Sequence, residues 1–230
     1  MRGAVRSFVL VMLACLAGGL MPQARAAASH AAMEAASVRT APSGERIRFE
    51  AGHYPKLSLP DGRQEMVRSM LNIAGPMHFG NFVWDEARIP AGKVWVRVDL
   101  ARQILSVFRD GHEIGSAVIL YGTDGKPTPT GRFIILEKNQ DYYSHSYHAE
   151  MPYALRLTKD GVAIHGSKVS QGWATHGCIG VPLGFAKLLF GAAHKGDPVV
   201  IVAPTGIHSL PLNSVGKVPK PNGVLPRLFQ

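Results

Sequence analysis

Two histidines and a cysteine stand close together in a glycine-rich stretch, GVAIHGSKVSQGWATHGCIGVP, at residues 161–182. A cysteine attacks a carbonyl carbon only as the thiolate, so it needs a neighbouring base, cation or helix N-terminus to lower the pKa of its thiol. Cys178 is the candidate nucleophile, and His165, at the end of a predicted strand, is the candidate base. Glycines between them let the chain fold back and bring the imidazole to the sulfur. The pairing predicts acyl transfer through a cysteine.

Two neighbours of the cysteine suit the same chemistry. Gly177 leaves its backbone N–H open to an oxyanion that develops on the attacked carbonyl. His176 lies too close to Cys178 in sequence to be the obvious base, so we expect it to flank the site. A zinc site is the alternative, with His145 or His148 as a further ligand. The CxxC and HExxH spacings typical of zinc do not occur, so we predict no metal and no cofactor.

The start of the chain has the layout of a cleavable secretory signal at residues 1–26. Arg2 and Arg6 precede an apolar run at 8–20, and Ala-Arg-Ala at 24–26 has the small-x-small pattern of a cleavage site. The apolar run is shorter than the roughly 20 residues that a transmembrane anchor needs. We therefore predict export to the periplasm or cell envelope, with no transmembrane span after signal removal.

Export changes the meaning of the two cysteines. Cys15 leaves with the signal, so Cys178 becomes the only thiol of the mature chain and no intramolecular disulfide is expected. A lone cysteine in an exported protein indicates a reactive thiol or an intermolecular disulfide. The chemistry of Cys178 is thus the simplest reason for its presence.

The net charge of the chain and its distribution limit the classes of binding partner that we predict. The formal net charge of +9 suits an anionic polymer, an envelope surface or simple solubility. The basic residues are scattered, with no Lys/Arg block and no zinc-finger spacing, so no nucleic-acid partner is predicted. The oligomeric state is not determined by any of these features.

The elements that must position the cysteine are mostly strands. Apolar residues alternate with polar ones from residue 94 onward, and Asp-Gly at 110–111 is typical of a hairpin turn. One helix is predicted from Pro182, with Gly196 as its stop. We expect a mainly β fold with one or two helices, a curled sheet or sandwich. The predicted strands cover residues 94–100, 104–109, 114–121, 132–137, 154–158, 162–165 and 197–202.

Other segments are harder to interpret. Residues 27–45 are predicted to be disordered, and residues 46–90 to drape over the main domain with a short helix at 65–73. Residues 139–152 are polar and aromatic, and they are predicted to form an exposed excursion. The predicted organisation is a signal peptide at 1–26, an N-terminal extension at 27–92, a catalytic domain at 93–202 and a proline-containing extension at 203–230.

The motifs resemble the active-site signature of the L,D-transpeptidase catalytic domain, the YkuD family. That signature runs roughly HG[ST]…G…[ST]HGC, and here it is HGS at 165–167, Gly172 and THGC at 175–178. A family loop ending in TP-x-G-x-F is matched by TPTGRF at 128–133. The likeness covers about residues 93–202.

The resemblance implies a cell-wall enzyme that acts on peptidoglycan stem peptides. Cys178 would attack the carbonyl before the terminal D-residue of a tetrapeptide, and His165 would carry the proton to the leaving amine. The carbonyl of Gly166 would hold the imidazole tautomer, and the N–H groups of Gly177 and Cys178 would bind the oxyanion. An amine acceptor gives transpeptidation; water gives an L,D-carboxypeptidase or an amidase.

One position departs from the family pattern. Gly180 stands where the family often has arginine, and the interval between the histidine and the cysteine is shorter than in many members. Substrate and acceptor preference are therefore open, as is a non-catalytic wall-binding module, against which the intact site argues. Tyr153 and Trp173 are substrate-lining or packing residues. The full set of candidate lining residues is Tyr153, Ser167, Trp173 and Thr175.

Overall fold

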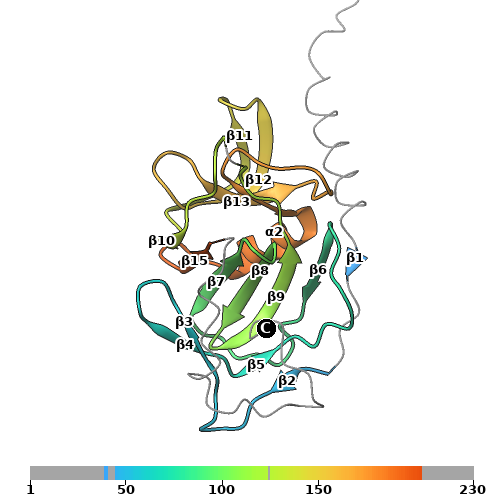
Figure 1. Ribbon diagram of the computed structural model, residues 1–230, viewed down its shortest axis with the longest axis vertical. Coiled ribbons are helices and arrows are strands. Elements are labelled where there is room, and N and C mark those ends of the chain that lie inside the picture. The colour runs from blue at the N-terminus through green and yellow to red at the C-terminus, as the bar shows by residue number, and fades with distance from the viewer. Residues whose placement is uncertain (1–38, 41–44, 124, 204–230) are drawn as a thin grey trace, which may run out of the picture.

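The structure is a computed structural model that describes residues 39–40, 45–123 and 125–203 (Figure 1). This part of the chain forms three β-sheets and one α-helix, which confirms the predicted mainly β fold. The helix α2 covers Leu183–Ala192. The strands are β1 (Arg39–Thr40), β2 (Ile47–Arg48), β3 (Lys56–Ser58), β4 (Gln64–Met66), β5 (Ser69–Met70), β6 (Asn81–Trp84), β7 (Val94–Asp99), β8 (Ile104–Arg109), β9 (His112–Val118), β10 (Gly131–Ile134), β11 (Glu137–Ser144), β12 (Ala149–Arg156), β13 (Ala163–Ser167), β14 (Ile179–Pro182) and β15 (Pro198–Val202).

The larger sheet has the strand order β1-β6-β9-β8-β7-β15-β10, with β5 beside β9 and β2 beside β5. Its centre is the hairpin β8–β9, and the two residues between the strands, Asp110 and Gly111, have φ of 47° and 77°. Two positive φ values identify the type of tight turn that matches the twist of paired strands. The predicted Asp-Gly hairpin is confirmed.

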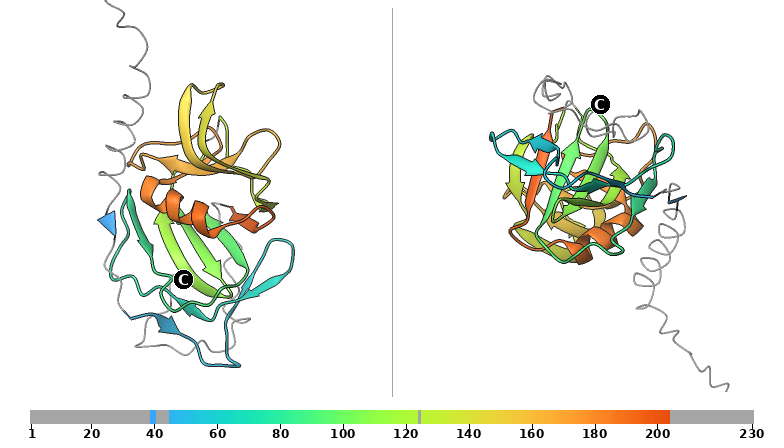
Figure 2. Two further views of the ribbon diagram at one scale, coloured as in Figure 1. Left: turned by 180° about the vertical axis from the view of Figure 1, so that it is seen from behind. Right: turned by 90° about the horizontal axis from the view of Figure 1, so that it is seen from below.

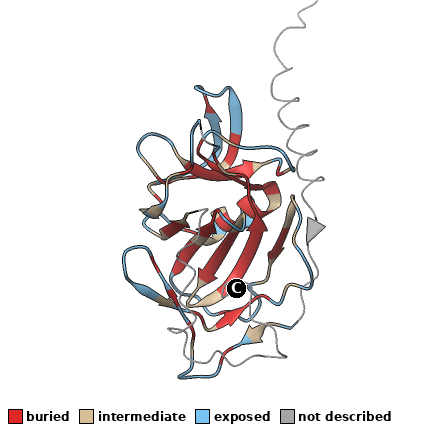
Figure 3. Cartoon of the chain, in the orientation of Figure 1, coloured by how far each residue is buried: buried red, intermediate tan, exposed pale blue. Residues whose placement is uncertain are grey.

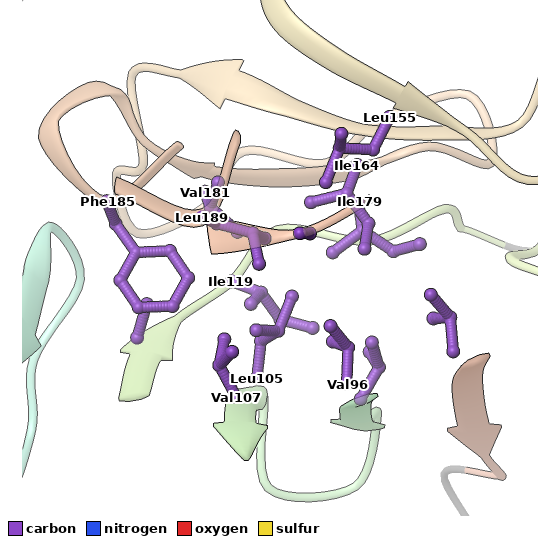
Figure 4. Packing of buried hydrophobic residues seen from close by; sticks show 14 of the residues in the cluster. Val96, Leu105, Val107, Ile119, Leu155, Ile164, Ile179, Val181, Phe185 and Leu189 are labelled. Carbon is purple, nitrogen blue, oxygen red and sulfur yellow. The ribbon is translucent and has the colours of Figure 1, made fainter. Parts of the chain in front are cut away.

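The second sheet has the order β11-β12-β13-β14, and β13 and β14 run parallel. Helix α2 lies between the two sheets, touching β12 and β13 on one side and β6 and β9 on the other (Figure 2). Phe185 and Leu189 of the helix are fully buried and belong to one apolar cluster with Ile164 of the second sheet and Leu105 of the larger one (Figure 4). The site-bearing sheet is thus held on the larger sheet by a continuous apolar core.

Apolar residues between positions 47 and 70 cover one face of the larger sheet. Trp95 and Phe108 stack there at 4.4 Å between ring centroids, and apolar residues of the N-terminal segment such as Leu57 and Met70 cover them. The helix predicted at 65–73 is wrong. The segment instead supplies β4 and β5, because its backbone groups pair with other segments and tertiary pairing outweighs weak local propensity.

The prediction of an exposed excursion at 139–152 is correct for the exposure of most of these residues, but it missed that they form strands. These residues lie in the long hairpin β11–β12, which projects from the body and is exposed at its outer end (Figure 3). Exposure on both faces removes the alternation that marks a half-buried strand. The predicted strand at 132–137 is in part wrong, because β10 ends at Ile134 in one sheet and β11 begins at Glu137 in the other.

The helix is confirmed, with Pro182 at its N-cap rather than inside its first turn. The chain ends the helix at Ala192, ahead of Gly196, which has φ of 90°. Among the described residues no helix is long and apolar enough to cross a membrane. The predicted signal at 1–26, most of the segment predicted to be disordered and the C-terminal residues from 204 lie outside the described residues.

Candidate active site

The parallel pair β13–β14 brings His165 and Cys178 to one place. Ile164 pairs with Ile179 and His165 pairs with Gly180, so Cys178 follows this register next to Ala163 just before β14. A small apolar cluster of Met151, Ala163 and Cys178 confirms the contact. Alternate residues of a strand share a face, so His165 lies on the same face as Ala163 and is a diagonal neighbour of the cysteine.

The imidazole of His165 is held by its own chain neighbour. Its Nδ1 lies 2.9 Å from the carbonyl oxygen of Gly166. A carbonyl only accepts, so Nδ1 carries the proton and Nε2 is left as a bare acceptor. Burial lowers the pKa of His165, and the hydrogen bond to Gly166 opposes this shift. The resting imidazole is therefore neutral, which is the state a general base needs.

The thiol is also held in its neutral form. Burial raises the pKa of Cys178, a backbone hydrogen bond from Ala163 opposes the shift, and the charge of Asp160 adds to it. The sulfur lies 3.8 Å from the carbonyl oxygen of Gly161, a weak acceptor contact for the S–H. The described site thus rests as a neutral thiol beside a neutral imidazole, and the thiol must lose its proton during attack.

The turn before the cysteine is fixed by hydrogen bonds. Gly177 has φ of 106°, a backbone conformation that favours glycine. The Thr175 hydroxyl donates to the carbonyl of Cys178 at 2.5 Å, and the Thr175 N–H donates to the carbonyl of Tyr121 at 3.0 Å. Thr175, a predicted lining residue, therefore uses its hydroxyl to shape the turn.

Thr128 is a site neighbour that sequence reasoning missed. Its buried hydroxyl accepts from the Gly122 N–H at 2.9 Å and donates to the carbonyl of Gly177 at 3.0 Å. A Cβ on Gly122 would lie 2.7 Å from the backbone of Gly177, so these two backbones touch. The TPTGRF motif was the available signal, because it begins at Thr128.

His176 flanks the site, as its spacing predicts, and is exposed. Its ring stacks on Tyr147 at 4.8 Å and 16° between planes, and Lys126 donates to the Tyr147 hydroxyl at 2.9 Å. Tyr147 stands in the turn of the β11–β12 hairpin. Sequence reasoning missed both Tyr147 and Lys126, since neither carries a motif and the hairpin alone brings them here.

The remaining predicted lining residues occupy different surroundings. Trp173 is 59% exposed, and Lys168 Nζ lies 5.6 Å from the centre of its ring, so it does not pack under the loop. Tyr153 is half-buried against Phe190 and has φ of 56°, which is unusual for a bulky residue. Its neighbour Pro152 lies close to Gly166, where an added Cβ would be 3.2 Å from the Pro152 ring.

Gly180 is closely surrounded. A Cβ there would lie 3.1 Å from the Ser167 Cβ and 3.5 Å from the Leu120 Cβ. The Gly180 backbone also exchanges hydrogen bonds with Leu120 at 2.8 and 3.0 Å. Ser167 and Leu120 therefore fill the direction in which an arginine at this position would start.

The donors for a zinc site do not gather. In the described ranges no group of three or more His, Cys, Asp or Glu side chains could hold a metal ion. His145, a proposed zinc ligand, packs edge-on against Tyr143 in the projecting hairpin. The arrangement around Cys178 is one of a thiol, an imidazole and backbone N–H groups.

Part of the chain is similar to a known protein family. Residues 93–201 match the model of the L,D-transpeptidase catalytic domain, YkuD, the family that the sequence motifs resemble. L,D-transpeptidase 1 of Mycobacterium tuberculosis (strain ATCC 25618 / H37Rv) is 29% identical over 120 residues, which cover 45% of this chain and 48% of the relative. The match thus spans about half the length of that curated relative.

Solved structures of L,D-transpeptidases are similar as well. One from Mycobacterium smegmatis is 23% identical, with a TM-score of 0.46 and coverage of 49% of this chain and 59% of that chain. One from Stackebrandtia nassauensis is 27% identical, with a TM-score of 0.46 and coverage of 52% and 58%. The likeness to the L,D-transpeptidase family rests on the sequence match at residues 93–201.

Proposed function

We propose that the protein is an exported L,D-transpeptidase, a cysteine acyltransferase that acts on peptidoglycan stem peptides in the periplasm or cell envelope. The observation that carries the proposal is the hydrogen bond from His165 Nδ1 to the Gly166 carbonyl, which leaves Nε2 as a base on the face that Cys178 shares. The family match at residues 93–201 supports the substrate class. Its role would be in peptidoglycan biosynthesis and hence cell-wall organisation and cell shape.

The first half-reaction forms a thioester. His165 Nε2 takes the Cys178 proton as the sulfur attacks the carbonyl carbon before the terminal D-residue of a donor tetrapeptide. The backbone N–H groups of Gly177 and Cys178 stabilise the oxyanion of the tetrahedral intermediate. When the C–N bond breaks, the imidazolium returns its proton to the leaving D-amino acid, and the acyl group stays on sulfur.

The second half-reaction releases the acyl group. An amine of an acceptor stem attacks the thioester, His165 takes its proton, and the thiol is regenerated as the new amide bond forms. Water in place of the amine would give a tripeptide and make the enzyme an L,D-carboxypeptidase. Exposed Trp173, together with Tyr153 and Ser167, is assigned to the walls that hold the two stems.

Incubation of the mature protein with a disaccharide-tetrapeptide, followed by mass spectrometry, tests the proposal. Dimeric muropeptides together with free D-amino acid are the expected products, and tripeptide alone would assign hydrolysis instead. Cys178→Ala should abolish both products. Activity retained by Cys178→Ala would refute the mechanism, and zinc-dependent activity lost with a chelator would favour the metal alternative.

A carbapenem offers a second test of the nucleophile. The thiolate opens the β-lactam ring, the ring nitrogen takes the proton, and the adduct has the summed mass of protein and drug. We expect one adduct on Cys178 and none on the Cys178→Ala variant. A non-catalytic wall-binding module would bind peptidoglycan but form no adduct.

A further inference from the structure

Thr128 lies outside the catalytic pair, yet it is bonded to the peptide that should bind the oxyanion. Its side chain is buried, and its hydroxyl lies 2.9 Å from the Gly122 nitrogen and 3.0 Å from the Gly177 oxygen. The directions of both bonds are unambiguous. An N–H only donates and a carbonyl only accepts, so the hydroxyl accepts from Gly122 and gives its single proton to Gly177.

The hydrogen bond from Thr128 to the Gly177 carbonyl fixes the orientation of the peptide plane between Gly177 and Cys178. The peptide that joins Gly177 to Cys178 is planar and trans, so its N–H points opposite to its carbonyl. Holding the Gly177 carbonyl toward Thr128 therefore aims the Cys178 N–H the other way. That N–H is one of the two donors assigned to the oxyanion.

This peptide needs an external anchor. Gly177 has φ of 106° and no side chain, so its own conformational preferences do not select one orientation of the plane. Contact with the Gly122 backbone limits translation, because a Cβ on Gly122 would meet Gly177 at 2.7 Å. Contact alone does not choose the direction of the carbonyl, whereas the Thr128 hydroxyl does.

We propose that Thr128 is a positioning residue of the acyl-transfer reaction, which orients the oxyanion-binding peptide through its hydrogen bond to the Gly177 carbonyl. The inference rests on the proposed function of Cys178. It gives the TPTGRF loop a specific task, since the hydroxyl links that loop to the cysteine turn 49 residues further along the chain.

The test compares two reactions of the same sulfur. Acylation by a carbapenem passes through an oxyanion, whereas alkylation by iodoacetamide forms the S–C bond with loss of iodide and no oxyanion. Thr128→Val removes the hydroxyl at nearly constant shape, and Thr128→Ser keeps it. Rates of both reactions at Cys178 are measured by mass spectrometry, with thermal unfolding to confirm that each variant is folded.

Thr128→Val should lower the acylation rate on the order of 10²-fold, the usual effect of losing an oxyanion donor, and leave alkylation within a few-fold. Thr128→Ser should restore acylation to within several-fold of wild type. If valine prevents folding, Thr128→Ala takes its place with the same expectations. Unchanged acylation in the folded variant, or equal losses in both reactions, would overturn the positioning role. A wild-type protein that is alkylated but never acylated would refute the proposed function itself.

Discussion

The Nδ1 of His165 donates a proton to the carbonyl oxygen of Gly166, the next residue in the chain, at 2.9 Å. A main-chain carbonyl thus does the orienting work that a carboxylate does in a Ser-His-Asp triad. The carbonyl brings no net negative charge, so it stabilises an imidazolium less than a carboxylate would. Together with burial this favours a neutral imidazole and a neutral thiol at rest.

Substitution of the base should remove the acyl-transfer reaction. His165→Gln keeps a polar side chain of similar reach but has no basic nitrogen, so carbapenem acylation of Cys178 should fall by roughly 10² to 10⁴-fold. The rate is measured by mass spectrometry under pseudo-first-order conditions. His194→Gln, at an exposed position outside the site, is the matched control and should leave the rate unchanged. Full activity in His165→Gln would assign the base elsewhere.

The pH dependence of thiol reactivity separates a neutral pair from an ion pair. Since burial raises the pKa of Cys178, iodoacetamide alkylation should keep rising as the pH passes the ordinary thiol range near 8.5. A preformed thiolate–imidazolium pair would instead give a plateau near neutral pH. Alkylation of Cys178 followed from pH 5 to 10 measures this, and such a plateau would contradict the neutral pair.

Burial of neutral His165 should also make the fold less stable in acid. Its pKa is lowered in the folded state, so below about 6.5 the unfolded chain binds more protons than the folded one. Stability from this group is therefore present above that pH and is lost as the pH falls toward the folded pKa. Urea unfolding at pH 7 and pH 5 should show a larger acid loss for wild type than for His165→Gln. The pKa of His112 is also lowered in the folded state. Wild type and His165→Gln should therefore both lose the part of the unfolding free energy at pH 5 that comes from His112.

Strands with a clear apolar pattern and a recognisable turn at one end were predictable from the sequence. β8 has the predicted bounds because its mainly apolar run ends at an Asp-Gly turn. β11 and the first part of β12 were missed because the largely exposed residues of β11 leave no period-two pattern, whereas the end of β12 overlaps the strand predicted at 154–158. The cysteine and its histidine could be paired from residue chemistry, and the β13–β14 register brings them together. Thr128 had a signal as the first residue of TPTGRF, but the motif does not name its partner, since the hydrogen bond to Gly177 depends on how distant loops fold together.

Filling the space at Gly180 should destabilise the domain. A Cβ there would lie 3.1 Å from the Ser167 Cβ, so in Gly180→Ala the Ser167 side chain must move by a few tenths of an ångström, and the overpacking should cost about 1 kcal/mol or more of unfolding free energy. Urea denaturation measures the loss. Ser167→Gly should relieve the clash, so the double variant should be more stable than the two single losses predict. Additive losses would show that the two positions do not compete for space.

The stack between Tyr147 and His176 should couple the hairpin tip to the cysteine turn. Because the two rings stack, Tyr147→Ala and His176→Ala should show a coupling energy of about 0.5–1.5 kcal/mol in a double-mutant cycle of urea unfolding. Both residues are exposed, so we expect each single variant to remain folded. Tyr142→Ala is the matched control: it removes an exposed tyrosine from the same hairpin, and it should be additive with His176→Ala. Zero coupling for Tyr147 would mean that the hairpin tip moves independently of the turn that carries Cys178.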